Sequence, residues 1–269
     1  WQWLIADVAK DHPEVIWLSE AFTKPAMMHT LAKAGFQQSY TYYAWRNLTW
    51  ELEDYCRELA GDAAAYMRPS FWPTTHDILT PYMQYGGPTA WKLRAALAAT
   101  LVPTYGIYTG YELMESVARP GVEEQIDNEK YEYKDRHWAD YEPGGPKAGQ
   151  SLAPYLTRLN EIRRAHPALR WLRNLRFHHV DDENILCFSK SRILPDGSRD
   201  TIIVVANLDP HGMRESLIHL DMPALGLEWW STMPVHDLVT DAWWDWRQEA
   251  YVRLGPDTEP VHIVEVRSY

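Results

Sequence analysis

The sequence predicts an α/β protein, the second half of a (β/α)8 barrel of the TIM type followed by an antiparallel β-sandwich. Residues 14–168 pass four times from a strand-like run to a run with helical periodicity, which is typical of βα units and a parallel sheet. From about Trp171 onward, short strand-like runs alternate with turn residues, and no helix of useful length is indicated. We therefore expect two domains, with residues 1–168 forming the half barrel and residues 169–269 forming the sandwich.

The βα units follow one another in order along the first domain. Their expected strands are residues 14–22, 38–45, 68–77 and 104–113. Their expected helices are residues 26–36, 47–61, 87–102 and 151–169. One face of residues 47–61 carries Leu48, Leu52, Tyr55, Cys56 and Leu59 at helical spacing. Gly35 and Gly61 come at the ends of two of these helices as candidate C-terminal caps.

The chain begins inside an apolar helical pattern, residues 1–8, that stops before Pro13. A domain rarely opens within an element, so we expect this chain to be the later part of a longer protein. Four parallel strands could instead form a small doubly wound sheet. No glycine-rich phosphate-binding loop follows any of the strands, and we therefore favour the half barrel, whose catalytic residues would lie at the C-terminal ends of its strands.

The second domain is indicated by six short runs. They are residues 175–180, 184–191, 201–208, 215–222, 250–255 and 262–268. Turn residues such as Asp181, Asp182 and residues 195–197 separate them, which favours antiparallel pairing.

The composition argues against several classes of function. The 269 residues carry a formal net charge of −11, which disfavours nucleic-acid and membrane-surface partners. Cys56 and Cys187 lie far apart and outside any His/Cys cluster, so we expect free thiols, no disulfide and no metal site. No apolar run approaches the roughly 20 residues that span a bilayer. No signal peptide is recognisable, and we expect a cytoplasmic protein.

The aromatic composition points towards carbohydrate. Trp and Tyr number 14 and 16 against 5 Phe, and rings with a polar edge suit clefts that bind sugars. The alternative is that most of these rings belong to the core.

Titratable residues stand near the ends of three expected strands. Glu20 closes the first, Asp77 beside His76 closes the third, and Glu112 closes the fourth. Carboxylates that converge on one barrel mouth suit glycoside chemistry, in which one acid is protonated and another stays ionised beside an oxocarbenium-like transition state. The alternative is that each acid caps a loop or lies on the surface.

These segments resemble a known enzyme family along essentially the whole chain. The segments "WLSEAF", "FWPTTHD" and "GIYTGYELME" are similar to the motifs of barrel strands five, seven and eight in the α-amylase superfamily of retaining glycosidases. Within that superfamily, "LSEAFTKP", "AKAGFQQSYTYYAWR", "THDILT" and "DNEKYEY" resemble the bacterial α-1,4-glucan:maltose-1-phosphate maltosyltransferases. The resemblance is to the C-terminal part of such an enzyme.

The resemblance implies a double displacement that needs no cofactor and no metal. Maltosyl would pass from α-maltose 1-phosphate, through a covalent enzyme intermediate, to the non-reducing end of an α-1,4-glucan such as glycogen. Glu20 would be the general acid/base and Asp77 the transition-state stabiliser. His76, Lys130 and Tyr131 would bind the sugar. A homodimer is also implied.

One part of the family pattern is missing. The nucleophilic aspartate belongs to barrel strand four, and Asp7 lies within a helix and is no substitute for it. We therefore expect the chain to be inactive until it is joined to, or complemented by, an N-terminal portion. We expect Glu112 to be structural, and Trp45 and Arg46 to line the mouth. The alternatives are an α-glucan hydrolase or a trehalose-forming isomerase of the same superfamily, or a non-catalytic glucan-binding module.

Overall fold

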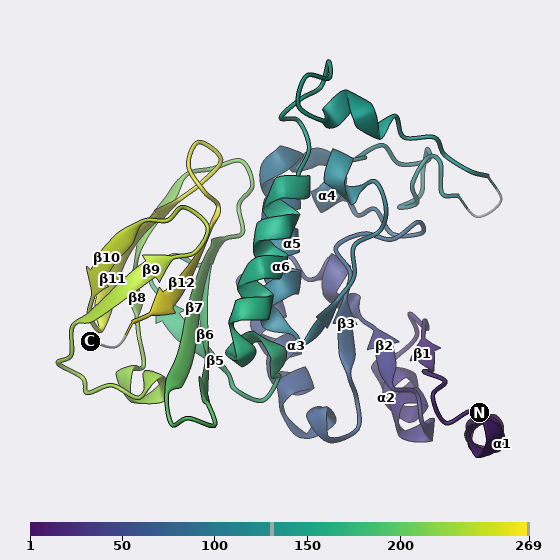
Figure 1. Cartoon of the computed structure of the whole chain (residues 1–269), viewed down its shortest axis with the longest axis horizontal. Coiled ribbons are helices and arrows are strands. Elements are labelled where there is room, and N and C mark those ends of the chain that lie inside the picture. The colour runs from purple at the N-terminus through teal and green to yellow at the C-terminus, as the bar shows by residue number, and fades with distance from the viewer. Residues whose placement is uncertain (130–131, 268–269) are drawn as a thin grey trace.

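The computed structural model describes residues 1–129 and 132–267 of the chain. Within these residues there are two sheets, one parallel with four strands and one antiparallel with eight. Helices α5 (Gly87–Leu101) and α6 (Ala153–Ala165) lie between the two sheets (Figure 1). The structure is therefore an α/β arrangement followed by an all-β region, as the change of pattern along the sequence predicts.

The strands of the first sheet follow the order of the sequence. They are β1 (Leu18–Ser19), β2 (Gln38–Tyr40), β3 (Pro69–Phe71) and β4 (Thr104–Tyr105), and each neighbouring pair is parallel. Each strand lies inside a predicted one but is shorter, because the chain soon leaves the sheet. A 3-10 helix follows β2 at Tyr42–Trp45, and Pro73, which has no N–H for a ladder, comes two residues after β3.

The helices agree with the apolar periodicity of the sequence. The α-helices besides α5 and α6 are α1 (Gln2–Asp11), α2 (Pro25–Ala34), α3 (Thr49–Ala60) and α4 (Pro81–Tyr85). The 3-10 helices are Tyr42–Trp45, Asp62–Ala65, Tyr111–Leu113, Trp138–Tyr141, Pro167–Arg170 and Met222–Leu225.

Two details of the helix predictions differ from the structure. Gly35 ends α2 with a left-handed φ of 119°, as a C-terminal cap should, whereas Gly61 after α3 has a φ of −77°. Leu48 was assigned to the buried face of α3, but its side chain is 53% exposed. Leu48 precedes the first helical turn and so does not lie on that face.

Helix α5 carries a buried arginine behind the parallel sheet. Arg94 is 1% exposed, and its guanidinium donates to the carbonyl oxygen of Arg46 at 2.7 Å and to that of Tyr43. The guanidinium carbon lies 3.8 Å from the centroid of the Tyr43 ring, and the Tyr43 hydroxyl donates to the Arg94 carbonyl oxygen at 2.6 Å. These contacts satisfy a charge that would otherwise be costly to bury, and they fasten α5 to the segment after β2.

The second sheet runs without a break in the order β10-β9-β12-β7-β6-β5-β8-β11. Its strands are β5 (Leu175–Val180), β6 (Ile185–Ile193), β7 (Arg199–Asn207), β8 (Arg214–His219), β9 (Met233–Asp237), β10 (Trp243–Trp246), β11 (Glu249–Leu254) and β12 (Val261–Val266). The first four residues of β5 pair with β6, and its last two, His179 and Val180, pair with β8. The predicted antiparallel sandwich is thus formed by one continuous sheet that curls around an apolar core, because β5 belongs to both layers.

Strands β9 and β10 are additions to the sequence-based prediction. Trp243, Trp244 and Asp245 of β10 are all exposed, so this strand lacks the alternation of buried and exposed residues that reveals a strand in a sequence.

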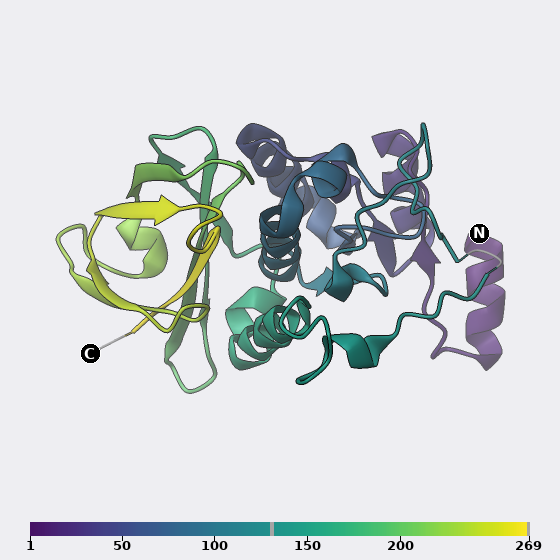
Figure 2. The same cartoon turned by 90° about the horizontal axis from the view of Figure 1, so that it is seen from above.

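Of the two hydrophobic cores in the described part of the chain, one crosses from the helices to the second sheet. Leu97 of α5 and Leu159 of α6 belong to the same buried cluster as Val204 of β7 and Ile263 of β12. Seen from above in Figure 2, the helices cover one face of this sheet. The division of the chain between residues 168 and 169 remains a prediction, since the core is continuous across it.

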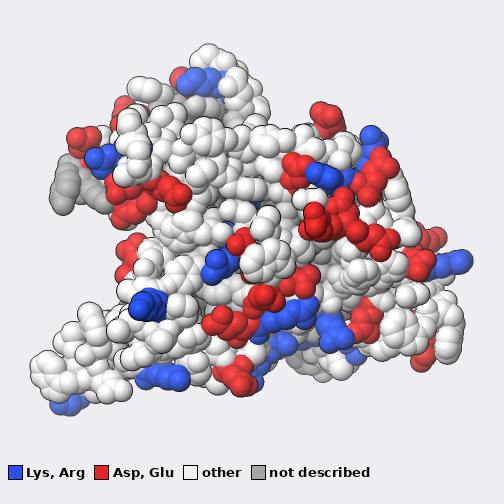
Figure 3. Space-filling view, turned by 180° about the vertical axis from the view of Figure 1, so that it is seen from behind, with Lys and Arg blue, Asp and Glu red and all other residues white. Residues whose placement is uncertain are grey.

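The outer surface is mixed in charge. On the face shown in Figure 3, acidic and basic side chains are interspersed among broad neutral areas. Among the helices of the described residues, none has the length and apolar character that crossing a bilayer requires.

Candidate active site

The C-terminal ends of the parallel strands share one edge of the first sheet. Tyr40 at the end of β2 pairs with Ser70 of β3, and Phe71 at the end of β3 pairs with Tyr105 at the end of β4. Because the strands are parallel and aligned in this way, the residues that follow them emerge on the same side. We refer to this side as the strand-end edge.

Glu20 follows β1 directly at the strand-end edge, and its side chain is exposed. The charge of Glu20 influences Tyr40 of the next strand. Burial raises the pKa of the Tyr40 phenol, and the negative charge of Glu20 raises that pKa further. The described residues therefore give Glu20 an aromatic neighbour but do not enclose it.

A stacked pair of aromatic rings lies beside Glu20 at the strand-end edge. Tyr40 and Trp72, which directly follows β3, stack with ring centroids 5.2 Å apart and an angle of 10° between their planes. The indole N–H of Trp72 donates to the Ser70 hydroxyl oxygen at 3.0 Å, which fixes the ring. A Cβ atom at position 106 would lie 2.2 Å from the indole, so Gly106 leaves the space that Trp72 fills. Flat rings beside a carboxylate suit a sugar, which has apolar C–H faces and polar hydroxyls.

Trp45 and Arg46, both predicted to line the mouth, have different contacts. The rings of Trp45 and Phe22 meet edge to face at 5.4 Å, and the Trp45 indole N–H donates to Glu123 at 2.9 Å. The guanidinium of Arg46 instead lies over the rings of Tyr42 and Tyr55, at 5.7 Å and 5.6 Å from their centroids. Of these two residues, Trp45 is the one that contacts Phe22, which lies two positions after Glu20 in the chain.

His76 and Asp77 lie in a tight turn after β3. The Asp77 backbone N–H donates to the Thr75 hydroxyl at 3.1 Å, and the Gln125 backbone N–H donates to the His76 carbonyl oxygen at 3.2 Å. His76 Nε2 is 3.1 Å from an Asp77 carboxylate oxygen, and each side chain is 34% exposed. The His76 ring lies 6.1 Å from that of Tyr108, between centroids. The two polar side chains are thus held together and remain accessible.

A buried arginine organises the loop next to this pair. Arg136 is 4% exposed and forms ion pairs with Glu129 at 2.8 Å and Glu115 at 3.1 Å. The hydrogen bonds from Arg136, with a smaller contribution from the Tyr108 hydroxyl, lower the pKa of Glu129 to about 2. Burial, followed by the contact with Glu129 at 2.7 Å, raises the pKa of Tyr108 to about 12. We call Tyr108, Glu115, Glu129 and Arg136 the Arg136 cluster.

The sequence gives no sign of the Arg136 cluster. Its two glutamates, Glu129 and Glu115, lie on irregular segments 7 and 21 residues from Arg136, without helical or strand periodicity to relate them. The segment "EYKDRHW" around Arg136 has the mixed charges of a solvated loop, so the sequence does not distinguish this buried arginine from an exposed one.

Residues 177–266 match a protein-family model described as "GLGE, C-terminal". Over 268 residues the chain is 53% identical to α-1,4-glucan:maltose-1-phosphate maltosyltransferase 2 of Streptomyces coelicolor, covering 99% of this chain and 39% of that protein. It is 46% identical over 274 residues to the α-1,4-glucan:maltose-1-phosphate maltosyltransferase of Arcanobacterium haemolyticum, with 99% and 39% covered. The chain belongs to this maltosyltransferase family and matches a C-terminal part of its members.

The chain spans about 39% of the length of these curated relatives. Its fold is similar to that of an α-amylase from Anoxybacillus, with a TM-score of 0.70 at 13% identity, covering 100% of this chain and 56% of that one. The α-amylase-like fold implied by the sequence motifs is therefore confirmed.

The predicted site residues lie on two different parts of the chain. Glu20 and the His76–Asp77 pair lie at the strand-end edge, after β1 and β3. Lys130 and Tyr131 lie outside the described residues. Their neighbour Glu129, a member of the Arg136 cluster, has a left-handed φ of 53°.

Glu112 has structural contacts, as expected for a residue left out of the catalytic set. Its carboxylate accepts the Gly110 backbone N–H at 3.0 Å, and its carbonyl oxygen accepts the Leu152 backbone N–H at 2.7 Å. These bonds connect the segment after β4 to the start of α6.

Proposed function

We propose that this chain is the C-terminal part of a retaining maltosyltransferase. The whole enzyme moves maltosyl units from α-maltose 1-phosphate to the non-reducing ends of α-1,4-glucans and releases phosphate. The observation that carries the proposal is the 53% identity, along the whole chain, to a Streptomyces coelicolor protein named for that transfer. The position of two carboxylates, Glu20 and Asp77, at one edge of a parallel sheet supports it.

We also propose that β1 to β4 are the second half of a (β/α)8 barrel. In support, the side chains around β1 are apolar but uncovered: Trp3 is 75% exposed, Ile16 69% and Leu18 54%. An exposed strand edge flanked by such side chains suits pairing with a further strand. The N-terminal portion of the enzyme, which the relatives have beyond the matched 39%, would supply that strand and the nucleophilic aspartate.

In the proposed reaction Glu20 acts twice. It first gives its proton to the departing phosphate while the aspartate attacks the anomeric carbon, which inverts the configuration there. It then accepts the proton of the acceptor's 4-hydroxyl, and that oxygen displaces the enzyme carboxylate with a second inversion. An acid of this kind needs a raised pKa, and burial by the N-terminal portion would supply the low-dielectric surroundings that the described residues do not.

We assign the neighbouring residues to binding the sugar and stabilising the transition state. Asp77 holds sugar hydroxyls as positive charge develops on the ring, and His76, 3.1 Å from its carboxylate, adds a further hydrogen bond to the sugar. The stacked rings of Tyr40 and Trp72 form a platform for a glucose unit. Lys130 and Tyr131 would bind the outer glucose of the donor.

The test is an assay of phosphate release from α-maltose 1-phosphate with glycogen as acceptor. We expect no transfer by the chain alone, and transfer when it is joined to the N-terminal portion. In the joined enzyme, Glu20→Gln should lower kcat by about 10²–10⁴-fold, because a positioned acid/base contributes that much. Glu14→Gln, an exposed acid just before β1, is the matched control and should retain activity.

Four outcomes would contradict the proposal. Measurable transfer by the chain alone would show that the nucleophile is here. Reducing sugar released from starch without phosphate release from the donor would favour a hydrolase, and trehalose formed from maltose would favour the isomerase. A glucan-binding module would bind glucan equally well after Glu20→Gln and Asp77→Asn and would show no transfer in any form.

The homodimer and the cytoplasmic location implied by the family resemblance remain predictions. Light scattering of the joined enzyme would test the former, and fractionation of cells the latter.

A further inference from the structure

Two histidines meet across neighbouring strands of the antiparallel sheet, far along the chain from the candidate active site. His179 of β5 and His219 of β8 are direct cross-strand partners. Asp181 lies two residues after His179 and therefore points to the same side. Its backbone N–H donates to the Leu217 carbonyl oxygen at 3.2 Å, which holds the residue beside β8. The next pair inward, Val180 and Ile218, packs on the apolar core, so the three polar side chains lie on the outer face.

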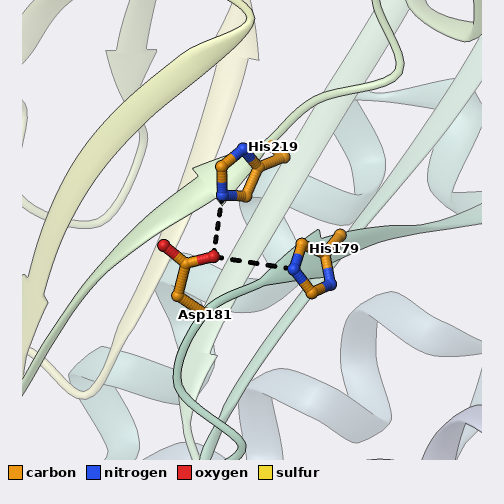
Figure 4. A group of neighbouring side chains, drawn as sticks. All are labelled: His179, Asp181 and His219. Atoms are coloured by element: carbon orange, nitrogen blue, oxygen red, sulfur yellow. Dashed lines mark hydrogen bonds and ion pairs between the residues drawn. The ribbon is translucent and has the colours of Figure 1, made fainter.

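The nitrogen and oxygen atoms of these side chains converge, as Figure 4 shows. The Oδ1 atom of Asp181 is 2.8 Å from His219 Nε2 and 3.5 Å from His179 Nε2. One such atom from each of the three residues lies within 4.8 Å of the others. Ligands bound to one zinc ion at about 2.0–2.2 Å are separated by roughly 3.4 Å in a tetrahedral site, so changes of a few tenths of an ångström up to about 1.4 Å in the distances between these atoms would suffice.

The second nitrogen of His219 also has a suitable partner. Its Nδ1 lies 3.6 Å from the carboxylate of Glu249, the residue opposite His219 on β11. A metal-bound histidine usually gives its other N–H to a carboxylate, which fixes the tautomer and the ring orientation. The order of strands β5, β8 and β11 thus places a ligand, a second ligand and its supporting carboxylate side by side.

We propose that His179, Asp181 and His219 bind one divalent transition-metal ion, of which Zn²⁺ suits the donors best. Two imidazoles and one carboxylate are ligands for zinc, whereas Mg²⁺ and Ca²⁺ prefer oxygen alone. Three protein ligands leave a fourth position for water. Glu249 is a positioning residue that acts through His219.

This inference revises the expectation of no metal site. That expectation rests on the absence of a short Cys/His spacing, and here the two histidines are 40 residues apart and are brought together only by strand pairing. Among the described residues this is the one group of three or more His, Cys, Asp or Glu side chains close enough to share an ion.

The bound ion would join the two layers of the curled sheet. β5 changes partner from β6 to β8 between His178 and His179, so the ion would hold the strand just after that change. An ion that binds only the folded chain raises its apparent stability. The competing interpretation is that the two histidines only form hydrogen bonds and ion pairs with Asp181. A measurement of zinc binding distinguishes this interpretation from the proposed metal site.

The test is calorimetric titration of the untagged chain with ZnCl2, together with thermal unfolding. We expect one ion per chain and an increase in Tm on adding zinc, but no binding of Mg²⁺. His179→Gln should weaken zinc binding by at least about 10-fold and abolish the increase in Tm, since a ligand is lost. His179 is the suitable variant because its side chain is 75% exposed and contributes little to packing. Glu249→Gln should weaken binding by about 10-fold.

His12→Gln is the matched control. His12 also lies beside a carboxylate, that of Glu14 at 3.2 Å, but in a contact between one imidazole and one acid. Its zinc affinity should equal that of the parent chain. The proposal is overturned if the parent chain binds no zinc, or if His179→Gln binds it as tightly as the parent does.

Discussion

Glu129 gains its low pKa chiefly from one buried neighbour, Arg136. Because the carboxyl is about 20% exposed and pairs with a guanidinium that is 4% exposed, the attraction is only partly screened by water. The same carboxylate accepts the hydroxyl of Tyr108, which lies next to His76. The charge of Glu129 therefore supports both the loop that continues to Lys130 and the residues around Asp77.

We predict that this carboxyl makes stability depend on acid pH. The ordinary pKa of a glutamate is near 4.5 and that of Glu129 in the folded chain is about 2. Its contribution is therefore complete above pH 4.5 and is lost progressively as the pH falls towards 2. Glu129→Gln should lower the free energy of unfolding at pH 7 by about 2 kcal/mol and by much less at pH 2.

Denaturant unfolding at the two pH values, followed by tryptophan fluorescence, is the measurement. Glu14→Gln, on the surface, should change neither value. An equal loss in Glu129→Gln at both pH values would show that the charge of Glu129 is not what stabilises the loop.

The segment after β4 depends on one glycine. We predict that Gly106→Ala pushes the Trp72 indole away from its stacked position on Tyr40, since the added Cβ would lie 2.2 Å from the ring. Overpacking of this kind costs about 1–3 kcal/mol. Near-ultraviolet circular dichroism should lose the signal of the stacked rings, and the unfolding midpoint should fall. Thr109→Ala, exposed on the same segment, is the control, and a spectrum unchanged by Gly106→Ala would contradict the prediction.

The edge of the sheet at which all four parallel strands end was predictable, because the βα pattern constrains their direction. Glu20 and Asp77 could be assigned to one edge from the alternation of strands and helices, since parallel strands must all point the same way. Strand lengths were not predictable: the aromatic run 38–45 reads as one strand, yet Tyr42–Trp45 turns into a 3-10 helix. Sequence periodicity shows which face of a segment is apolar, but not where tertiary contacts end the ladder.

Contacts between distant segments lay beyond the sequence altogether. Nothing in the spacing relates Arg136 to Glu115, or His179 to His219, because loop closure and strand pairing create both contacts. The curled form of the second sheet was missed for the same reason, since it depends on β5 exchanging partners along its length.

The whole chain should unfold as one unit. Leu97 of α5 is fully buried in a cluster that includes Val204 and Ile263 of the second sheet, so the two regions share stabilising contacts. We predict that Leu97→Ala lowers the free energy of unfolding by about 2–5 kcal/mol and lowers a single calorimetric transition without splitting it. Met27→Ala, half-exposed on α2, should have little effect. Two resolved transitions, with only one shifted by Leu97→Ala, would contradict the shared core.

The contacts of Arg94 affect how variants of this protein should be interpreted. Its guanidinium holds the backbone of Tyr43 and Arg46, and Trp45 between them carries the indole that meets Phe22 and Glu123. A substitution of the buried Arg94 would therefore alter the position of Trp45 at the strand-end edge, where glucan is proposed to bind. In a survey of natural or selected variants, a substitution at this position would be classed as a folding defect by its burial. It could equally change which acceptors are used while the protein stays folded, and acceptor profiles belong beside melting curves for such variants.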